Sequence, residues 1–457
     1  MADPRARRSL GAALLASSLL PLNSTMIAVA LPDIAREFAR PPGTVAQAVV
    51  ASYLVAAIVL QSPGGKLGDR LGHRRVLALG EVLMAAGAVL GMVAGSLGVL
   101  AVARVLMAAG GAAVVPTTVA LLRIELPPER RGRAFGLFGA IMSLAAGVGP
   151  VVGGELVRAF GWASIFAVNL PVLAIVALLA ATRRRREADL RDGSRFDVLG
   201  SVLLTVTLAA LVLGLEASGT LAAVLLATCA VLLVPFVWWE RRAADPVVAF
   251  GLFRSVPFTA GSLLVALQNL VTYTLLFELP QMLGALLAVD SAGTGRLLVA
   301  MTATVILASL VAGRLTDIVG PRPMAVGGVV VCLAGVGLLA AGDLSSLRQL
   351  VLPLALLGLG VGLATPAAQA ASLTAVAREH SGAAAGIGST MRYLGGVVGV
   401  AVLGRLVDLT GDRSVVLGQH RSVLTVFAVA LVVSLACAAA LPGRSAARKP
   451  ARTPNGR

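Results

Sequence analysis

Four polar side chains interrupt long apolar stretches of this sequence, and they are its strongest candidates for carrying charge or binding a proton. With the stretches that contain them, they are Asn23 (10–32), Arg104 (97–122), Glu278 (256–280) and Arg392 (384–407). A charged side chain inside a membrane span is energetically costly and is, by default, a functional position. The four are therefore predicted to be embedded polar positions.

Among these positions, only the carboxyl of Glu278 is suited to load and release protons. Its alternative is an interfacial acid that reaches the water outside. Asn23 cannot titrate and so cannot carry a proton. If the two stretches are helices that cross a bilayer, a rise of about 1.5 Å per residue places Asn23 and Arg104 at similar depth in one helix bundle. For Arg104, the alternative to a functional role is a structural, hydrogen-bonding arginine.

Two segments that follow apolar stretches repeat one pattern of glycine, basic residues and a single acid. Residues 65–75 read GKLGDRLGHRR and residues 313–322 read GRLTDIVGPR. Gly65, Gly68 and Gly72 are predicted to allow a tight turn between helices, and the alternative is a charged anchor that only sets topology. The candidate residues of this loop and its repeat are Gly65, Lys66, Asp69, Arg70, Gly72, Arg74, Arg75 and Asp317.

A glycine-rich block at 146–154, AGVGPVVGG, lies inside another apolar stretch. Gly149 and Gly153 form a G-x-x-x-G face that lets two helix backbones approach closely, and Pro150 can kink a helix. The candidate residues of this block are Gly147, Gly149, Pro150, Gly153 and Gly154. Polar residues that could line a cavity, or could instead join helices, are Gln268, Asn269, Tyr273 and Gln369.

The elements that must position these residues are predicted to be membrane-spanning helices. Hydrophobic residues make up 58% of the 457-residue chain and charged residues only 13%, which excludes a soluble fold of this length. Stretches of about 20 apolar residues can span a bilayer. Fourteen such stretches are predicted, at 10–32, 45–65, 76–95, 97–122, 134–157, 162–181, 197–216, 220–239, 256–280, 294–315, 323–342, 349–373, 384–407 and 422–441. The fold is therefore predicted to be an all-α, polytopic membrane protein.

Basic residues set the predicted orientation. Most of the 38 Lys and Arg residues fall in the loops that face the cytoplasm if the N-terminus lies there, as the positive-inside rule requires. Both termini are thus predicted to lie on the cytoplasmic side of a bacterial plasma membrane. The net charge of +16 then needs no nucleic-acid partner.

No motif in the sequence indicates an enzyme. It has no G-x-x-x-x-G-K-[ST] loop for ATP, and the protein is predicted not to be an enzyme. His73, His380 and His420 are predicted in separate loops, so no metal site is expected. No cofactor is predicted.

The repeated loop divides the chain into two halves. Paired halves are typical of transporters that rock two bundles about a central site. The predicted parts are a six-helix bundle at 1–182, a cytoplasmic linker with two extra transmembrane helices at 183–254, a second six-helix bundle at 255–441 and a basic cytoplasmic tail at 442–457.

Five blocks, in order along the chain, resemble the motifs of one family. They are LNSTMIAVALP (22–32), GKLGDRLGHRR (65–75), RVLMAAGGA (104–112), AGVGPVVGG (146–154) and WASIFAVNLP (162–171). Together they resemble the major facilitator superfamily, in its branch of 14-helix drug:proton antiporters. This resemblance covers nearly the whole chain. It implies two six-helix bundles plus two extra helices, 14 in all.

The resemblance also implies roles for the candidate residues. The acid matching Asp69 braces the cytoplasmic closure, and its target here would be the helix that begins near Gly382. The 146–154 block would bend its helix, limit leak and favour antiport. The position of Arg104 belongs to the proton-linked machinery, together with an acid at the position of Asn23. Asn23 departs from that acid, and Met107 and Ala108 depart from the usual Gln and Gly, so the coupling ion is open.

The predicted function is proton-driven export of hydrophobic or cationic drugs and toxic small molecules by alternating access. The partners are a small-molecule substrate, protons and the lipid bilayer, with the protein acting as a monomer. A first alternative is a dedicated exporter of one metabolite, antibiotic or lipid with different coupling. A second alternative is a non-transporting membrane scaffold or sensor.

Overall fold

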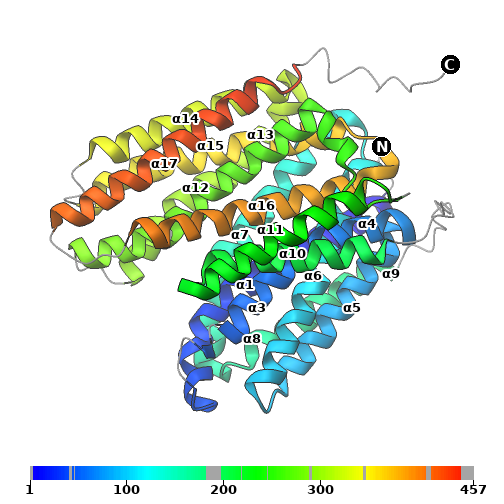
Figure 1. The fold of residues 1–457 in the computed structure, drawn as a ribbon, viewed down its shortest axis with the longest axis horizontal. Helices are drawn as coiled ribbons and strands as arrows, with labels where there is room; N and C mark the ends of the chain where they lie inside the picture. The colour runs from blue at the N-terminus through cyan, green and yellow to red at the C-terminus, as the bar shows by residue number, and fades with distance from the viewer. Residues whose placement is uncertain are drawn as a thin grey trace. The chain divides into compact units, whose positions relative to one another are not determined.

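Helices form almost all of the described chain (Figure 1). The computed structural model describes residues 4–40, 44–45, 47–181, 197–217, 219–243, 245–287, 291–342, 346–407 and 413–443. The predicted linker over 183–196 and the tail from 444 lie outside the described residues. Within lipid, backbone N–H and C=O groups must pair inside the protein, which is why so apolar a chain forms helices.

The helices of the first part of the chain coincide with its apolar stretches. They are α1 (Pro4–Glu37), η1 (Gln47–Ala51, a π-helix), α3 (Ser52–Val59), α4 (Gln61–Leu71), α5 (His73–Met92), α6 (Leu97–Glu125), α7 (Pro128–Phe160), α8 (Ser164–Ala167), α9 (Asn169–Ala181), α10 (Val198–Glu216) and α11 (Gly219–Glu240). A 3-10 turn, η2 (Phe250–Arg254), leads into the second part.

The second part continues the same pattern. Its helices are α12 (Val256–Leu287), α13 (Ser291–Val319), α14 (Pro321–Ala341), α15 (Leu347–Thr374), the 3-10 turn η3 (Arg378–His380), α16 (Ser381–Leu406) and α17 (Arg413–Ala439). Every predicted apolar stretch therefore falls on a helix or on a broken pair of helices.

The number of spans depends on two irregular segments. Among the described residues, 12 helices are long and apolar enough to cross a membrane, and the total is 13 when a bent pair is taken as one span. That pair, Ala48–Val59 with Gln61–Leu71, is bent by 46°. The predicted stretch at 162–181 is a shorter apolar helix, Ser164–Leu179. The all-helical, membrane-spanning prediction is confirmed, whereas a total of 14 exceeds this count.

The chain divides into two compact units. Unit 1 takes the described residues within Met1–Glu125, Ile141–Phe250 and Arg378–Thr390, and unit 2 takes those within Leu126–Ala140, Gly251–Ala377 and Met391–Arg457. Two helices change unit along their length. α7 belongs to unit 2 as far as Ala140 and to unit 1 beyond it, and α16 belongs to unit 1 as far as Thr390 and to unit 2 beyond it.

Unit 1 is built around α6, which packs against α1, α3, α4 and α5. A Cβ added at Gly80 of α5 would lie 2.7 Å from the carbonyl oxygen of Gly110 on α6, so only glycine permits this close approach. α10 and α11 pack against each other, and α10 also packs against α3. α11 leaves large apolar side chains such as Val231 and Val234 exposed, as expected of a surface that faces lipid.

Unit 2 is built around α15, which packs against α12, α13 and α14, while α17 packs against α12 and α14 (Figure 1). Its core is a set of buried, mostly aliphatic side chains from these five helices and from α16, among them Leu275, Val329, Leu354 and Leu424. Buried polar side chains such as Gln268 and Glu278 lie on the same helices.

Candidate functional site

Asp69, on α4, holds the first turn of α16 within unit 1. The backbone N–H of Gly382 donates to Oδ1 of Asp69 at 2.6 Å, and that of Ala383 donates to Oδ2 at 2.7 Å. The first N–H groups of a helix have no partner inside the helix and carry partial positive charge, so a carboxylate is a suitable acceptor. Gly382 is the target that the family resemblance implied.

Asp317, on α13, makes the equivalent contact within unit 2. The N–H groups of Gly132 and Arg133, in the second turn of α7, donate to its carboxylate at 2.8 and 3.0 Å. Each acid lies three residues before a glycine of positive φ that caps the next helix, Gly72 (91°) or Gly320 (95°). The repeated sequence pattern is therefore a repeated structural device.

Two of the predicted loop glycines do something other than make a turn. Gly65 and Gly68 lie inside α4, and only Gly72 forms the break before α5. A Cβ at Gly65 would collide with the carbonyl oxygen of Gly382, and one at Gly68 would lie 2.7 Å from the ring of His73. The prediction that all three glycines form the turn was wrong, because Gly65 and Gly68 instead allow close packing.

The basic residues of the 65–75 segment have different surroundings. The buried Lys66 ammonium pairs with Asp245, which also lies 3.5 Å from Nε of Arg70. Arg74 pairs with Glu125 at the end of α6, and Arg75 is exposed. Asp245 follows α11, so these pairs attach the segment after α11 to α4. No local pattern predicts Asp245, because its partner lies 179 residues away.

Arg104 is buried within unit 1 and has defined partners. Its Nε donates to the carbonyl of Val49 at 2.8 Å, and its guanidinium carbon lies 3.9 Å from the ring centroid of Tyr53. Val49 belongs to the π-helix η1, and such irregular turns are frequent at functional sites. Tyr53 in turn donates its hydroxyl to the carbonyl of Leu20 on α1 at 2.7 Å. Nη2 of Arg104 has no hydrogen-bond partner in the described part of the chain.

Asn23 lies one turn from Leu20 and pairs with a second asparagine. Its Nδ2 donates to Oδ1 of Asn169 on α9 at 2.7 Å, and Nδ2 of Asn169 donates back to Oδ1 of Asn23 at 3.0 Å. Asn23 and Arg104 thus lie in one unit, but the contacts described for them go to different partners. Asn169 belongs to the WASIFAVNLP block, and that motif was the available signal for it.

Glu278, on α12, contacts a histidine that the sequence did not assign to a site. Nδ1 of His420, on α17, lies 2.7 Å from Oε1 of Glu278, and the two side chains are 4% and 1% exposed. The prediction that all three histidines lie in loops was wrong. His420 is inside α17, and His73 is the first residue of α5. The first residues of α17 are polar, as loop residues often are, and yet they belong to the helix.

Arg392, on α16, lies within unit 2 near aromatic side chains. Its guanidinium carbon is 5.9 Å from the ring centroid of Phe138, and it interacts electrostatically with Tyr273 and Tyr393. Tyr273 packs against α16, because a Cβ at Gly396 would lie 3.0 Å from its ring. Two residues predicted separately, Arg392 and Tyr273, are therefore brought together.

The other predicted cavity residues are spread along unit 2. Gln268 is fully buried and accepts a hydrogen bond from the hydroxyl of Thr365 on α15 at 2.7 Å. Asn269 is half-buried and donates to the backbone carbonyl of Val265 in its own helix. Gln369, on α15, is half-buried. Gln268 therefore joins two helices through a hydrogen bond, which is the alternative to lining a cavity.

The glycine block lies on the part of α7 that belongs to unit 1. A Cβ at Gly149 would collide with Oγ1 of Thr25, and one at Gly153 would lie 3.1 Å from the carbonyl oxygen of Met26. These two glycines therefore let α7 approach α1 closely. Gly147 and Pro150 are exposed, and a Cβ at Gly154 would meet no atom within 4 Å.

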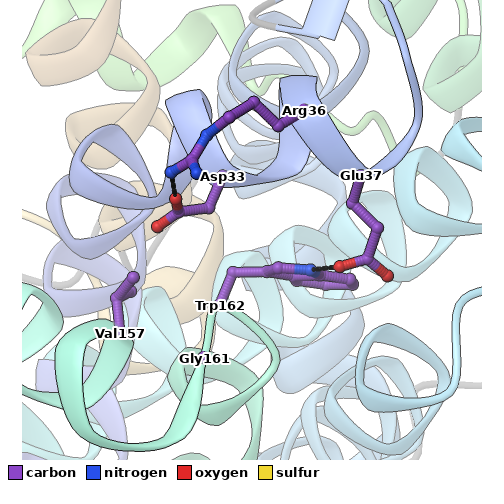
Figure 2. A pocket seen from close by; sticks show the side chains of 6 residues that line it. All are labelled: Asp33, Arg36, Glu37, Val157, Gly161 and Trp162. Atoms are coloured by element: carbon purple, nitrogen blue, oxygen red, sulfur yellow. Dashed lines mark hydrogen bonds and ion pairs between the residues drawn. The ribbon is translucent and has the colours of Figure 1, made fainter.

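Figure 2 shows a pocket of unit 1 that is lined by none of the predicted site residues. It is lined by Asp33, Arg36, Glu37, Val157, Gly161 and Trp162. The Trp162 indole N–H donates to Glu37, and Arg36 pairs with Asp33. A second, apolar pocket lies among α12, α13 and α15 of unit 2. Neither pocket is lined by a predicted cavity residue.

Comparisons with known proteins agree with this architecture. The sequence profile of the Major Facilitator Superfamily matches residues 13–281 and 261–457. Multidrug resistance protein Stp of Mycobacterium tuberculosis (strain CDC 1551 / Oshkosh) is 32% identical over 392 residues, which cover 84% of this chain and 72% of Stp. The tetracenomycin C resistance and export protein of Streptomyces glaucescens is 30% identical over 403 residues, covering 85% and 73%.

A solved structure shares the fold at low sequence identity. The human organic anion transporter MFSD10 (TETRAN) superposes with a TM-score of 0.70 at 17% identity, covering 94% of this chain and 100% of that chain.

Proposed function

Because this chain belongs to the major facilitator superfamily, whose members here include drug and antibiotic exporters, we propose that it exports hydrophobic or cationic small molecules by proton antiport. The protein is a multi-pass membrane protein with bacterial relatives. Beyond family membership and membrane location, we propose the proton as the coupling ion, alternating access as the cycle, and hydrophobic or cationic molecules as the substrates.

The observation that carries alternating access is the matched pair of acids. Asp69 accepts two hydrogen bonds from the start of α16, the part of that helix that belongs to unit 1, although the rest of α16 belongs to unit 2. Asp317 does the same for the start of α7, with the units exchanged. If each pair of bonds breaks, each helix start is free to move with the unit that holds the rest of its helix.

Such contacts suit a gate because they strongly favour the state in which they form. A hydrogen bond to a charged group contributes about 1.5–3 kcal/mol, so the four bonds together favour that state by roughly 6–12 kcal/mol, and opening requires an offsetting contribution of that size. We propose that the gate lies on the cytoplasmic side, with both termini in the cytoplasm. On this view the protein has 14 spans, α3 with α4 forming the second and α8 with α9 the sixth.

The remaining candidate residues take roles in the same proposal. Gly149 and Gly153 hold α7 against α1 and would limit leak, while Arg104 would belong to the proton-linked machinery. Gln268, Asn269, Tyr273 and Gln369 would offer polar groups to substrates on otherwise apolar walls, an arrangement suited to a permissive site. The transport unit would be the monomer.

Transport into proteoliposomes tests the proposal. The purified protein is reconstituted, a pH gradient is imposed, and the accumulation of ethidium and a panel of apolar drugs is followed. Gradient-driven accumulation that collapses with a protonophore is expected for the parent, and severe loss is expected for Asp69→Asn and Asp317→Asn. Glu155→Gln removes an exposed carboxylate of α7 and is the matched control. Substrate movement that ignores the pH gradient would exclude proton antiport.

A second candidate is a dedicated exporter of one antibiotic or metabolite. It is favoured by the Asn23–Asn169 pair, which places a non-titrating group where drug:proton antiporters are expected to have an acid. It is also compatible with the likeness to a protein that exports tetracenomycin C. The substrate panel separates the two, because a dedicated exporter would accumulate one chemical class only.

A further inference from the structure

A buried acid–base pair joins α12 and α17 inside unit 2. Oε1 of Glu278 and Nδ1 of His420 are 2.7 Å apart, a hydrogen-bonding distance, and both side chains are almost fully excluded from the surface. Both groups can gain or lose a proton, in contrast to the amides of Asn23 and Asn169. The pair is therefore a titratable site built from two helices that are far apart in sequence.

Buried apolar side chains flank the pair along both helices. Leu275, Leu279 and Met282 lie within one turn of Glu278, and Val416 and Val423 lie within one turn of His420. The buried hydroxyl of Thr274, also one turn from Glu278, bonds to the backbone carbonyl of Leu270. A charge in such surroundings is unfavourable unless it is paired. Oε2 of Glu278 and Nε2 of His420 have no hydrogen-bond partner among the described residues, so each group keeps one atom available for a proton.

Other charged side chains on the neighbouring helices at this end of unit 2 point elsewhere. They are Arg348 on α15, Arg405 on α16, and Arg413 and Arg421 on α17, and all four are exposed. The side chain of Arg296, on α13, lies outside what the structure describes. Glu278 and His420 thus form a buried acid–base pair in the described part of unit 2.

Counting protons shows what the pair can do. With one proton between them, Glu278 and His420 have zero net charge, either as two neutral groups or as carboxylate and imidazolium. Without that proton the pair carries a charge of −1, and with two it carries +1. An apolar environment favours the neutral, one-proton state. Water that reaches the pair stabilises its charged states, so hydration allows the proton to leave.

We propose that Glu278 and His420 together form the proton-binding site of this transporter, holding one shared proton when enclosed and releasing it when hydrated. This inference rests on the proposed proton antiport and adds its location. Conformational change that alternately encloses and hydrates the pair would carry one proton per cycle. The two groups share the proton across their 2.7 Å contact, so neither residue alone is the carrier.

The first test follows the proton directly and needs no transport. Infrared difference spectra of the purified protein are recorded across a pH titration, with the C=O stretch of a protonated carboxyl as the signal. A band that appears and disappears with pH is expected in the parent, absent in Glu278→Gln and shifted along the pH axis in His420→Gln. Thr274→Val changes a buried hydroxyl one turn from Glu278 and should keep the band. The same titrating band in Glu278→Gln would overturn the proposal.

The second test separates coupling from folding. Proteoliposomes are loaded with ethidium, and exchange of ethidium without a pH gradient is compared with uphill accumulation driven by the gradient. Glu278→Gln and His420→Gln can still hydrogen-bond, so α12 and α17 should stay joined. Thr274→Val, outside the proposed site, should keep both exchange and uphill accumulation within about twofold of the parent. Uphill accumulation, divided by exchange in the same variant, should fall at least tenfold in Glu278→Gln and in His420→Gln. Full uphill accumulation in both variants would assign the pair a structural role only.

The two proposals fail differently. Absence of gradient-driven transport in the parent would contradict proton antiport, while the infrared titration would still decide whether the pair binds a proton. Gradient-driven transport that persists in both variants would leave proton antiport standing and exclude this pair as its proton site.

Discussion

Replacing Asp69 with Asn should loosen the start of α16 by a predictable amount. Asp69 accepts one hydrogen bond on each carboxylate oxygen, from Gly382 and Ala383. An asparagine offers only one acceptor oxygen, because its other terminal atom is an N–H₂ donor. One hydrogen bond to a charged group is therefore lost, together with the favourable interaction between the carboxylate and the helix dipole.

The magnitude follows from these contacts. A hydrogen bond to a charged group contributes about 1.5–3 kcal/mol, and a central value of about 2 kcal/mol corresponds to roughly a thirtyfold change in an equilibrium constant. Hydrogen–deuterium exchange measures this equilibrium, because an amide exchanges when its hydrogen bond opens. The amides of Gly382 and Ala383 are expected to exchange roughly thirtyfold faster in Asp69→Asn.

The start of α7 provides the internal comparison. If the two gate contacts open together, as rocking bundles require, then the amides of Gly132 and Arg133 should also exchange faster in Asp69→Asn. If they open separately, only the α16 amides should respond, and Asp317→Asn should affect only those of α7. Unchanged exchange at Gly382 and Ala383 would refute the reasoning, since it would mean that Asp69 contributes nothing to holding that turn.

Three further predictions concern contacts elsewhere in unit 1. Arg104→Leu removes a buried charged hydrogen bond and a cation–π contact, so transport should fall at least tenfold in the proteoliposome assay, and Arg104→Lys should not restore it because lysine lacks the planar fork. Gly149→Ala should lower the melting temperature in detergent, because the added Cβ collides with α1; Gly154→Ala, which meets open space, should change it little. Asp245→Asn should expose the Lys66 amine to acylating reagents, as judged by mass spectrometry, and equal labelling in the parent would count against the ion pair.

The helices could be predicted from sequence because their signal is local. Apolar runs, loop charges and the repeated glycine–acid pattern lie within about 20 consecutive residues, so each apolar stretch matches a helix or a broken pair. The bent pair of α3 and α4 has a local cause as well as a distant partner. Its break lies at Leu60, and Pro63 cannot donate the helical hydrogen bond to the carbonyl of Val59. The π-helix before it accepts a bond from Arg104, on another helix, which no local pattern predicts.

The partners of the candidate residues could be predicted only where a motif named them. Asp69 was expected near Gly382 because the family resemblance implied it. His420 was not expected beside Glu278, because 142 residues separate them and a single histidine in a polar helix start has no distinctive pattern. Contacts of this kind depend on which helix faces pack together, which the apolar pattern of these helices does not specify.

Asn23 is well packed and hydrogen-bonded, although the family resemblance implies an acid at its position. Its Nδ2 donates to two oxygens at once, the Leu19 carbonyl and Oδ1 of Asn169, both at 2.7 Å. Asn23→Asp would replace this donor with an oxygen that faces two acceptors in a buried position. Leaving such groups unpaired costs about 1–3 kcal/mol, so the variant should melt at a lower temperature in detergent than the parent.

The matched variant Asn23→Gln separates this explanation from simple crowding. It keeps the donor but lengthens the side chain, so it tests size alone. A loss of stability in Asn23→Asp well beyond that in Asn23→Gln is expected if the donor matters. An Asn23→Asp protein as stable as the parent would mean that Asn169 can rotate its amide to donate, and that this position could hold the usual acid. If the loss is found, the chain's own packing excludes a first-helix carboxylate, which makes a proton site elsewhere, such as Glu278 with His420, a requirement of antiport.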